Sequence, residues 1–435
     1  MELFDRDRLA MLVQPDRVHR SVYADPEIFE LEMERVFGRA WLLLGHESQV
    51  KAPGDYFTTR MGLEPIFVTR KSDSEIAVLV NRCAHRGSMV CPEGRGNTER
   101  FVCPYHGWSY ELGGKLQAVP FASGYDKDRL PAGLKAVPRV AVYRGFIFGS
   151  LAATGEDLID FLGAAKASLD DFVDRAPGGE LEVAGGVFKH AYNGNWKLMI
   201  ENHLDGAHPA WVHASSVAVA RAAPEPGAPG KEHYYDIAVR QMRQNGAPDS
   251  VWEGTGMWTT PRGHGYMGDY HDDTRLVTGM GNPAFDDYRN TLIKEHGEEK
   301  ADGILRVTLW NTILYPNTSF MSQFRQLRIL HPLAVDRSVV YTYSFRMPRA
   351  PAQMFRDTVA FANVVNGTGS WVLTDDLEVY ERLQRGLTSG EVDWVFIGRG
   401  HGHDIPEKDG LRGKTGTSEV YIRAQLKAWR EYMTD

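Results

Sequence analysis

The sequence predicts an α+β fold in which a small all-β domain precedes a larger domain of antiparallel sheet and helices. From about Ala40 to Leu151, short alternating apolar segments are separated by glycine-rich or polar turns, as in small antiparallel strands. Farther along, apolar residues recur at helical spacing and are followed by strand-like runs and further helical patterns. A length of 435 residues, 43% of them hydrophobic, is enough for two such domains.

A helix is expected ahead of the β domain. Asp25 and Pro26 suit its start, because aspartate can accept a hydrogen bond from an amide that lacks a helical partner and proline is tolerated in the first turn. The apolar residues that follow are Ile28, Phe29, Leu31, Val36 and Phe37. We place the β domain at residues 38–157 and the larger domain at residues 1–37 and 158–435.

The larger domain is expected to mix helices with strands. A helix face is predicted after residue 157, and strand-like and helical runs follow in the last third of the chain. The helix face comprises Leu158, Leu162, Ala165, Leu169 and Phe172; the strands are expected at Phe320–Leu330 and Ser338–Phe345, and the later helices at Ala352–Val365 and Leu377–Leu387.

Composition excludes several classes of function. The net charge is -8, and acidic and basic residues are interspersed, so the sequence does not predict a nucleic-acid surface. No stretch approaches the roughly 18 apolar residues that crossing a membrane requires, so we expect a cytoplasmic protein. All three cysteines lie between Cys83 and Cys103, a clustering that favours a metal site over a disulfide framework.

Two cysteines and two histidines form the first candidate site. The chain reads C-A-H at residues 83–85 and C-P-Y-H at residues 103–106. Two thiolates and two imidazoles can hold a zinc ion, or a cluster of two irons and two sulfides with the cysteines on one iron and the histidines on the other. The candidate ligands are Cys83, His85, Cys103 and His106.

The spacing favours the iron–sulfur alternative. Common zinc hairpins use C-x-x-C or C-x-x-x-x-C pairs, whereas two like loops that each supply one thiolate and one imidazole suit a Rieske cluster. The segments CAHRG, from Cys83, and CPYHGWSYELGGKLQAVP, from Cys103, resemble the two cluster loops of the Rieske family. Cys91 has no histidine at a matching distance, so we expect it to be a core or loop thiol without a cluster role.

A second candidate site lies in residues 195–213, NWKLMIENHLDGAHPAWVH. Asp205 and His208 are three residues apart, which predicts that they are neighbours on one helix face. Pro209 disfavours helical geometry at His208, so we expect the helix to end or kink there and the chain to turn, bringing His213 beside His208. Two imidazoles would then meet one metal ion.

The same segment resembles the mononuclear-iron motif of Rieske oxygenase catalytic subunits, N-W-K followed by E-N-x-x-D-x-x-H-x-x-x-x-H. The resemblance implies that His208 and His213 are iron ligands, that Asn202 lines the site and that Asp205 orients His208. His203 matches no ligand of the motif, and we expect it to be a helix-surface or packing histidine.

The third iron ligand is expected from the C-terminal part of the chain, because oxygen-activating ferrous sites commonly use two histidines and one carboxylate. Residues 374–387, TDDLEVYERLQRGL, resemble the family's C-terminal segment, in which an acidic pair opens a helix. Asp376 is the predicted ligand. Asp375 and Glu378 have the spacing of a capping box, so Asp375 would cap the helix, and the reversed assignment of the two aspartates stays open.

The resemblance covers most of the chain, although residues 215–305 match no feature of the family. It implies a Rieske β domain ahead of a helix-grip catalytic domain, with one 2Fe-2S cluster and one ferrous ion per chain. It also implies a trimer, with or without a small beta subunit, whose electrons come from NADH or NADPH through a ferredoxin or flavin reductase.

The implied reaction is the activation of dioxygen at the ferrous ion to hydroxylate or cis-dihydroxylate an aromatic substrate. Arg325 and Arg328 are candidates to meet a substrate carboxylate, but arginines in an alternating strand usually face solvent, so acid and hydrocarbon substrates both stay open. A Rieske monooxygenase or oxidative demethylase would use the same two centres. A Rieske electron carrier or a zinc-stabilised binding module would account for the first site and leave the second unexplained.

Overall fold

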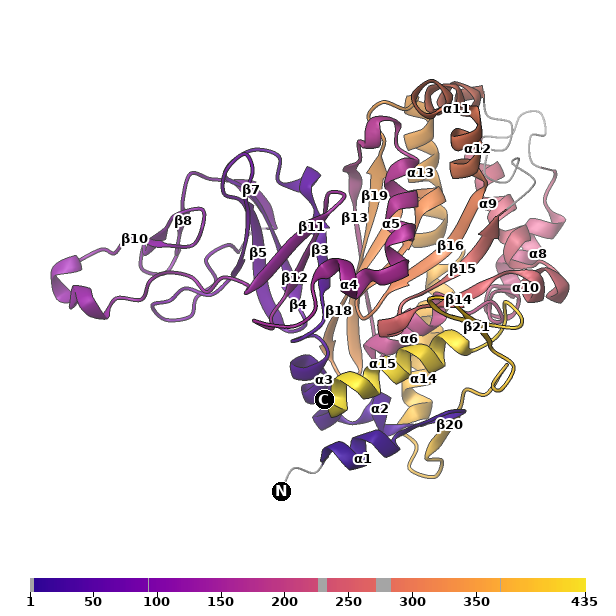
Figure 1. Ribbon diagram of the computed structural model, residues 1–435, viewed down its shortest axis with the longest axis horizontal. Coiled ribbons are helices and arrows are strands. Elements are labelled where there is room, and N and C mark those ends of the chain that lie inside the picture. The colour runs from indigo at the N-terminus through magenta and orange to yellow at the C-terminus, as the bar shows by residue number, and fades with distance from the viewer. Residues whose placement is uncertain (1–3, 93, 226–232, 271–282, 368) are drawn as a thin grey trace. The chain divides into compact units, whose positions relative to one another are not determined.

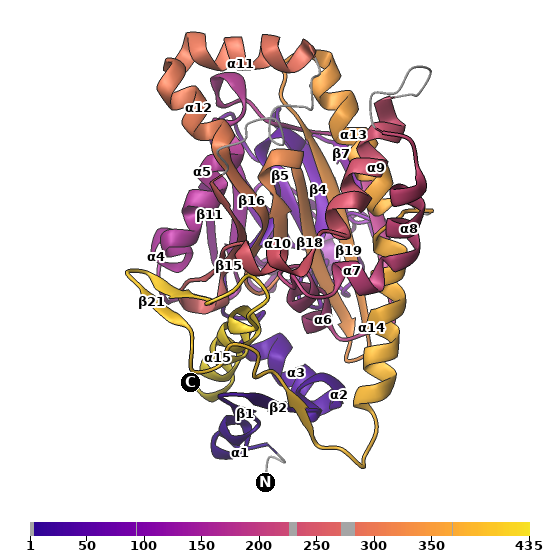
Figure 2. The same ribbon diagram turned by 90° about the vertical axis from the view of Figure 1, so that its right-hand side faces the viewer.

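The computed structural model describes residues 4–92, 94–225, 233–270, 283–367 and 369–435, and it divides into two units (Figures 1 and 2). One unit is Met33–Leu158, and the other combines Met1–Glu32 with Ile159–Asp435. The first consists mainly of antiparallel strands, and the second combines a large antiparallel sheet with helices, so the predicted α+β class is confirmed. No helix in the described ranges is long and apolar enough to span a membrane.

Antiparallel sheets make up the β unit. A four-stranded sheet has the order β6-β5-β4-β7, and two three-stranded sheets have the orders β11-β12-β3 and β10-β9-β8. The strands are β3 Leu42–His46, β4 Asp55–Met61, β5 Glu64–Arg70, β6 Ile76–Val80, β7 Arg95–Asn97, β8 Phe101–Val102, β9 Ser109–Tyr110, β10 Leu116–Ala118, β11 Arg139–Tyr143 and β12 Phe146–Ser150. Short 3-10 helices lie at η1 Glu47–Gln49, η2 Ala122–Gly124 and η3 Lys127–Arg129.

The second unit is built on a nine-stranded antiparallel sheet of order β13-β19-β18-β17-β16-β15-β14-β22-β21. A small sheet of order β1-β2-β20 joins the beginning of the chain to its C-terminal part. The strands are β1 Val13–Gln14, β2 Arg17–His19, β13 Glu182–Tyr192, β14 Met257–Thr259, β15 Gly265–Tyr270, β16 Val307–Leu314, β17 Thr318–Met321, β18 Gln326–Ala334, β19 Arg337–Arg346, β20 Trp394–Phe396, β21 Ile405–Glu407 and β22 Gly410–Arg412.

Helices pack along this sheet, with α13 against β19 and α9, and α15 against β14 (Figure 2). The helices are α1 Arg6–Met11, α2 Ser21–Ala24, α3 Pro26–Arg35, α4 Leu158–Leu162, α5 Lys166–Asp174, α6 Trp196–Asn202, α7 Pro209–Val212, α8 Ala214–Ala222, α9 His233–Asn245, α10 Asp249–Gly254, α11 Pro283–His296, α12 Glu298–Arg306, α13 Ala352–Asn366, α14 Leu373–Leu387 and α15 Val420–Thr434. Further 3-10 turns are η4 Gly163–Ala165, η5 Pro177–Gly179, η6 Pro261–Gly263 and η7 Ser322–Phe324.

Most of the predicted elements are present, and two are interrupted. Helix α3 begins at Pro26, and the Asp25 carboxylate accepts a hydrogen bond from the Glu27 amide at 2.9 Å, as predicted. The single helix expected from Leu158 to Phe172 is broken by η4, where Gly163 has a positive φ of 47°. The strand expected at Phe320–Leu330 is two strands, β17 and β18, separated by η7.

A buried charge cluster fixes the segment that leads into the second candidate site. The Glu32 side chain of α3 is fully buried and accepts hydrogen bonds from Lys197 Nζ at 2.5 Å, Trp196 Nε1 at 2.7 Å and Trp429 Nε1 at 2.6 Å. Burial lowers the pKa of Lys197, and the Glu32 carboxylate opposes that shift. The cluster joins α3, α6 and α15, so it holds the start of α6 against the rest of the unit.

Candidate metal centres

The two cysteine–histidine loops share one backbone conformation. In the first loop, the Cys83 carbonyl accepts from the Gly87 amide at 3.0 Å, and the Cys83 amide donates to the Ser88 carbonyl at 2.8 Å. In the second, Cys103 makes the equivalent bonds with Gly107 at 3.0 Å and with the Trp108 carbonyl at 2.8 Å. The glycines have positive φ values of 78° and 73°, a conformation that favours glycine.

The side chains of these loops fit a cluster held by two thiolates and two imidazoles. Cys83 and Cys103 are buried, and the rings of His85 and His106 lie 4.6 Å apart between their centroids. The His85 ring stacks on Trp108 with an interplanar angle of 1°. Its Nδ1 atom is buried and has no hydrogen-bond partner among the described residues, so a metal ion would satisfy an otherwise unbonded nitrogen.

Two other residues near the loops differ in chemistry from the four candidate ligands. The Tyr110 hydroxyl lies 3.0 Å from Cys83 Sγ and accepts from the Ala84 amide at 3.2 Å, a contact that no sequence pattern indicated. Cys91 belongs to the same apolar core, and burial raises the pKa of its thiol to about 12. A thiol held in its neutral form is a poor metal ligand.

The backbone at the second site differs from the prediction. Helix α6 ends at Asn202, so Asp205 and His208 lie in a turn and the predicted shared helix face is wrong. Proline at position 209 begins the short helix α7, because its fixed φ and missing amide suit a first helical position. His208 and His213 therefore bracket α7.

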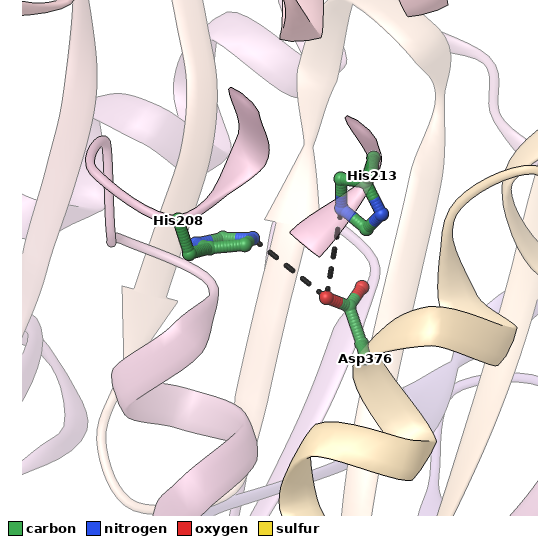
Figure 3. Close-up of side chains that lie close together, drawn as sticks. All are labelled: His208, His213 and Asp376. Atoms are coloured by element: carbon green, nitrogen blue, oxygen red, sulfur yellow. Dashed lines mark ion pairs between the residues drawn. The ribbon is translucent and has the colours of Figure 1, made fainter. Parts of the chain in front are cut away.

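Three side chains converge at this site (Figure 3). Asp376 Oδ1 lies 3.7 Å from His208 Nε2 and 3.6 Å from His213 Nε2. One ligand atom from each residue lies within 4.8 Å of the other two. His213 and Asp376 are buried, with 1% and 5% of their surface exposed. Two imidazoles and one carboxylate facing a common point form the donor set of an oxygen-activating ferrous site.

The remaining nitrogen of each histidine faces a carboxylate. His213 Nδ1 lies 3.2 Å from Asp375 Oδ2, a hydrogen bond, and His208 Nδ1 lies 3.6 Å from Asp205 Oδ2, an ion-pair distance. Such partners hold an imidazole in one orientation and leave its other nitrogen free to bind metal. Asp205 also accepts from the Ala207 amide at 2.6 Å, which shapes the turn.

Asp375 is therefore not the helix cap that the sequence predicted. Helix α14 begins at Leu373, two residues before Asp375, and its capping position is Val372, which makes no side-chain cap. The Ser370 hydroxyl accepts from the Thr374 amide at 3.2 Å instead. Because the helix starts earlier than predicted, the Asp375 carboxylate points to His213.

Asn202 connects the site to α14. Its amide nitrogen donates to Asp376 Oδ1 at 3.4 Å, and its oxygen accepts from the Tyr380 hydroxyl at 2.9 Å. Burial raises the pKa of Asp376, although both imidazoles oppose the shift. Burial alone would lower the pKa of His208, but Asp205 and Asp376 outweigh it and raise this pKa. A metal cation would stabilise the buried Asp376 anion.

A cavity of about 90 Å³ opens beside His208, His213 and Asp376. Its lining contains Arg328, which the sequence pattern placed in solvent but which is buried in the structure. His203 also lines the cavity, so it is a packing histidine at the site and does not lie on a helix surface. The other lining residues are Asn202, Asp205, His208, Pro209, His213, Gln241, Asn245, Trp252, Met267, Asn311, Met321, Phe361, Val365, Asn366, Val372, Leu373 and Asp376.

Both units match known protein families. The Rieske [2Fe-2S] domain profile matches residues 40–139, and the profile for the catalytic domain of the ring hydroxylating alpha subunit matches residues 177–435.

Curated relatives match nearly the whole chain. The toluate 1,2-dioxygenase alpha subunit of Pseudomonas putida is 33% identical over 98% of this chain and 94% of its own length. The 2-halobenzoate 1,2-dioxygenase large subunit of Burkholderia cepacia is 33% identical over 94% of this chain and 86% of its own. The anthranilate 1,2-dioxygenase large subunit of Acinetobacter baylyi is 34% identical over 96% and 90%, respectively.

Solved structures agree with this relationship. Naphthalene 1,2-dioxygenase with indole bound in the active site is 28% identical, covers 98% of this chain and 94% of that chain, and has a TM-score of 0.81. The predicted fold, the dioxygen-incorporating oxidoreductase activity and the 2Fe-2S and mononuclear-iron cofactors are thereby confirmed at the level of the family. The chain belongs to the ring hydroxylating alpha subunit family, the Rieske oxygenases that hydroxylate aromatic rings.

Proposed function

We propose that this chain is the terminal oxygenase component of a ring-hydroxylating system, with its two metal centres held by seven side chains. His208, His213 and Asp376 bind the mononuclear ferrous ion, and their convergence beside a cavity is the observation that carries the proposal. The 2Fe-2S cluster is held by Cys83, His85, Cys103 and His106.

A ferrous ion held by His208, His213 and Asp376 would supply the chemistry that activates dioxygen beside the substrate. The residues of the chain prepare that position. Asp375 forms a hydrogen bond with His213 Nδ1, and Asp205 lies beside His208 Nδ1. These carboxylates orient both imidazoles so that their Nε2 atoms face Asp376. Apolar side chains of the cavity, among them Met267 and Phe361, exclude water from the reacting ring.

The substrate is proposed to be an aromatic compound, and the product a cis-dihydrodiol. The relatives named above act on toluate, 2-halobenzoate and anthranilate, so benzoate-type acids are the first class to test. A ferredoxin or flavin reductase that draws on NADH or NADPH supplies the electrons, and three alpha subunits, with or without beta subunits, form the assembly.

The proposal is tested by following NADH and dioxygen consumption over a panel of aromatic acids and hydrocarbons with a reconstituted electron donor. Products identified by mass after reaction with labelled dioxygen should carry two oxygen atoms from one dioxygen molecule. A product with one labelled oxygen would favour the monooxygenase alternative, and absence of any product with both metals present would refute the oxygenase proposal.

The ligand assignments have a separate test. His208→Ala, His213→Ala and Asp376→Ala should each abolish product formation and lower mononuclear iron, while the cluster absorbance stays intact. The cluster is an internal control for folding, because its proposed ligands belong to the other unit. Retention of stoichiometric mononuclear iron in any of the three variants would remove that residue from the ligand set.

A further inference from the structure

Arg328 places a buried positive charge in the wall of the cavity that holds the candidate iron ligands. It stands on β18, opposite Ser319 of β17, and only 5% of its surface is exposed. It is the sole lysine or arginine among the described residues that line this cavity. Burying a guanidinium is costly unless an anion or strong hydrogen-bond acceptors compensate it.

The compensation that the protein provides is weak. Arg328 donates to Asn311 Oδ1 and to Ser319 Oγ at 3.4 Å, both longer than usual hydrogen bonds to oxygen. Its third partner, Met321 Sδ at 3.5 Å, is a weak acceptor. Among the described residues, no carboxylate forms an ion pair with its guanidinium, and the anion that acts on its charge is Asp376, one of the candidate iron ligands. Burial lowers the pKa of Arg328 to about 10, so the group stays charged at neutral pH.

Arg325, three positions earlier, is a buried arginine whose hydrogen bonds are all made within the protein. It donates to Thr358 Oγ1 at 2.7 Å and to two backbone carbonyls, of Gln323 at 3.2 Å and Met354 at 3.3 Å. It is absent from the cavity lining. The contrast indicates that Arg325 is structural and that Arg328 retains donors for a ligand in the cavity.

The neighbouring histidine adds no second positive charge. His203 Nδ1 lies 2.8 Å from the Ser319 hydroxyl, which also accepts from Arg328. Burial and the nearby Arg328 guanidinium hold the pKa of His203 well below its usual value, so this imidazole is neutral. Apart from the candidate iron ligands, Arg328 is therefore the one positively charged side chain in the described lining of the cavity, and one carboxylate would match it.

The rest of the cavity is largely apolar and small. The lining includes the apolar side chains of Met267, Met321, Phe361, Val365 and Leu373. The cavity volume of about 90 Å³ is smaller than the roughly 150 Å³ cavity that accepts benzene in another protein. A bound ring therefore requires the lining to move, which flexible methionine side chains allow, and two fused rings would require a larger displacement than one.

We propose that Arg328 binds the carboxylate of the substrate, and that the substrate class is a single-ring aromatic monocarboxylate. This inference rests on the proposed oxygenase function and adds the residue that selects an anion over a neutral ring. Arginine is suited to the task because its planar guanidinium can donate two parallel hydrogen bonds to one carboxylate.

The test measures binding without turnover. Benzoate and benzamide have nearly the same shape and differ in charge, and each is titrated calorimetrically into the iron-loaded oxygenase without oxygen. Wild type should prefer benzoate. Arg328→Gln should weaken benzoate binding by about 30-fold or more, the cost of removing one partner of a buried charge pair, and leave benzamide binding within about threefold. Unchanged benzamide binding shows that the variant is folded.

Two comparisons complete the test. Arg328→Lys should retain part of the preference for benzoate, because the charge stays and the paired hydrogen bonds are lost. Arg325→Lys, a buried arginine outside the cavity, should leave the ratio of benzoate to benzamide affinity unchanged. 2-Naphthoate, with the same carboxylate on two rings, should bind about 10-fold more weakly than benzoate.

An equal benzoate-to-benzamide ratio in wild type and Arg328→Gln would overturn the role of Arg328, and equal affinity for 2-naphthoate would overturn the single-ring limit. These failures are separate from failure of the oxygenase proposal. An enzyme that hydroxylates neutral rings and ignores acids would refute the substrate class alone, whereas an enzyme with both metals and no aromatic product would refute the function.

Discussion

Asp375 gives a direct test of how the iron site is held. Its carboxylate accepts from His213 Nδ1 at 3.2 Å, whereas Asp376 faces the Nε2 atoms of both histidines. In Asp375→Ala, the His213 ring loses the partner that fixes its orientation and tautomer. Removing such a partner weakens metal affinity by about 10- to 100-fold. The Asp375 side chain is 34% exposed, so water replaces part of the bond and we expect the lower end of that range.

The assay is an anaerobic ferrous titration of protein from which only the mononuclear iron has been removed, with cluster absorbance as the folding control. Asp375→Asn should lose less affinity than Asp375→Ala, because the amide oxygen can still accept from His213. Asp376→Ala should leave no measurable site. Wild-type iron affinity in Asp375→Ala would refute the role of this hydrogen bond, and an intact site in Asp376→Ala would reverse the two assignments.

Three further outcomes are expected. Cys83→Ser should lose the red-brown absorbance and the two acid-labile sulfides per chain, because a hydroxyl is a poor ligand for a soft metal site. Cys91→Ser should keep both, and stoichiometric zinc without labile sulfide in the wild-type protein would contradict the cluster assignment. Glu32→Gln should lower the free energy of unfolding, measured in denaturant titrations, by about 3–5 kcal/mol, because the buried Lys197 ammonium loses its anion. A loss under about 1 kcal/mol would show that stability does not depend on this ion pair. From the family resemblance we also propose that Asp205 links the two metal centres across subunits. Asp205→Ala should then keep both metals and lose substrate-coupled oxygen consumption, and wild-type coupling in the variant would argue against that path.

The features predicted most fully from the sequence are those that a short segment determines. In each cluster loop, a glycine four residues after the cysteine adopts a positive φ and closes the turn on the cysteine carbonyl. The positions of Gly87 and Gly107 relative to Cys83 and Cys103 are therefore visible in the sequence itself. Strands β8 and β9, on either side of the second loop, pair antiparallel, with Phe101 opposite Tyr110 and Val102 opposite Ser109.

The features that escaped prediction depend on where elements end. One polar side chain, Ser370, supports a start of α14 two residues before the acidic pair, which changes Asp375 from a cap into a partner of His213. Likewise, the burial of Arg328 cannot be read from an alternating strand, because helices far away in the sequence cover that face of the sheet. Tertiary packing decides both outcomes.

The two centres therefore depend on the fold to different degrees. The proposed cluster ligands come from neighbouring loops of one small unit, where backbone hydrogen bonds within each loop orient the cysteines. Two of the proposed iron ligands flank α7 and the third lies on α14, and one hydrogen bond, between His213 and Asp375, joins these segments across 162 positions of the chain. Their geometry requires α6 to be held in place, and the Glu32 cluster does so through Trp196 and Lys197 at the start of that helix. A buried ion pair is a weak source of stability, but it specifies one arrangement of three helices, and an iron site assembled from distant segments requires that single arrangement.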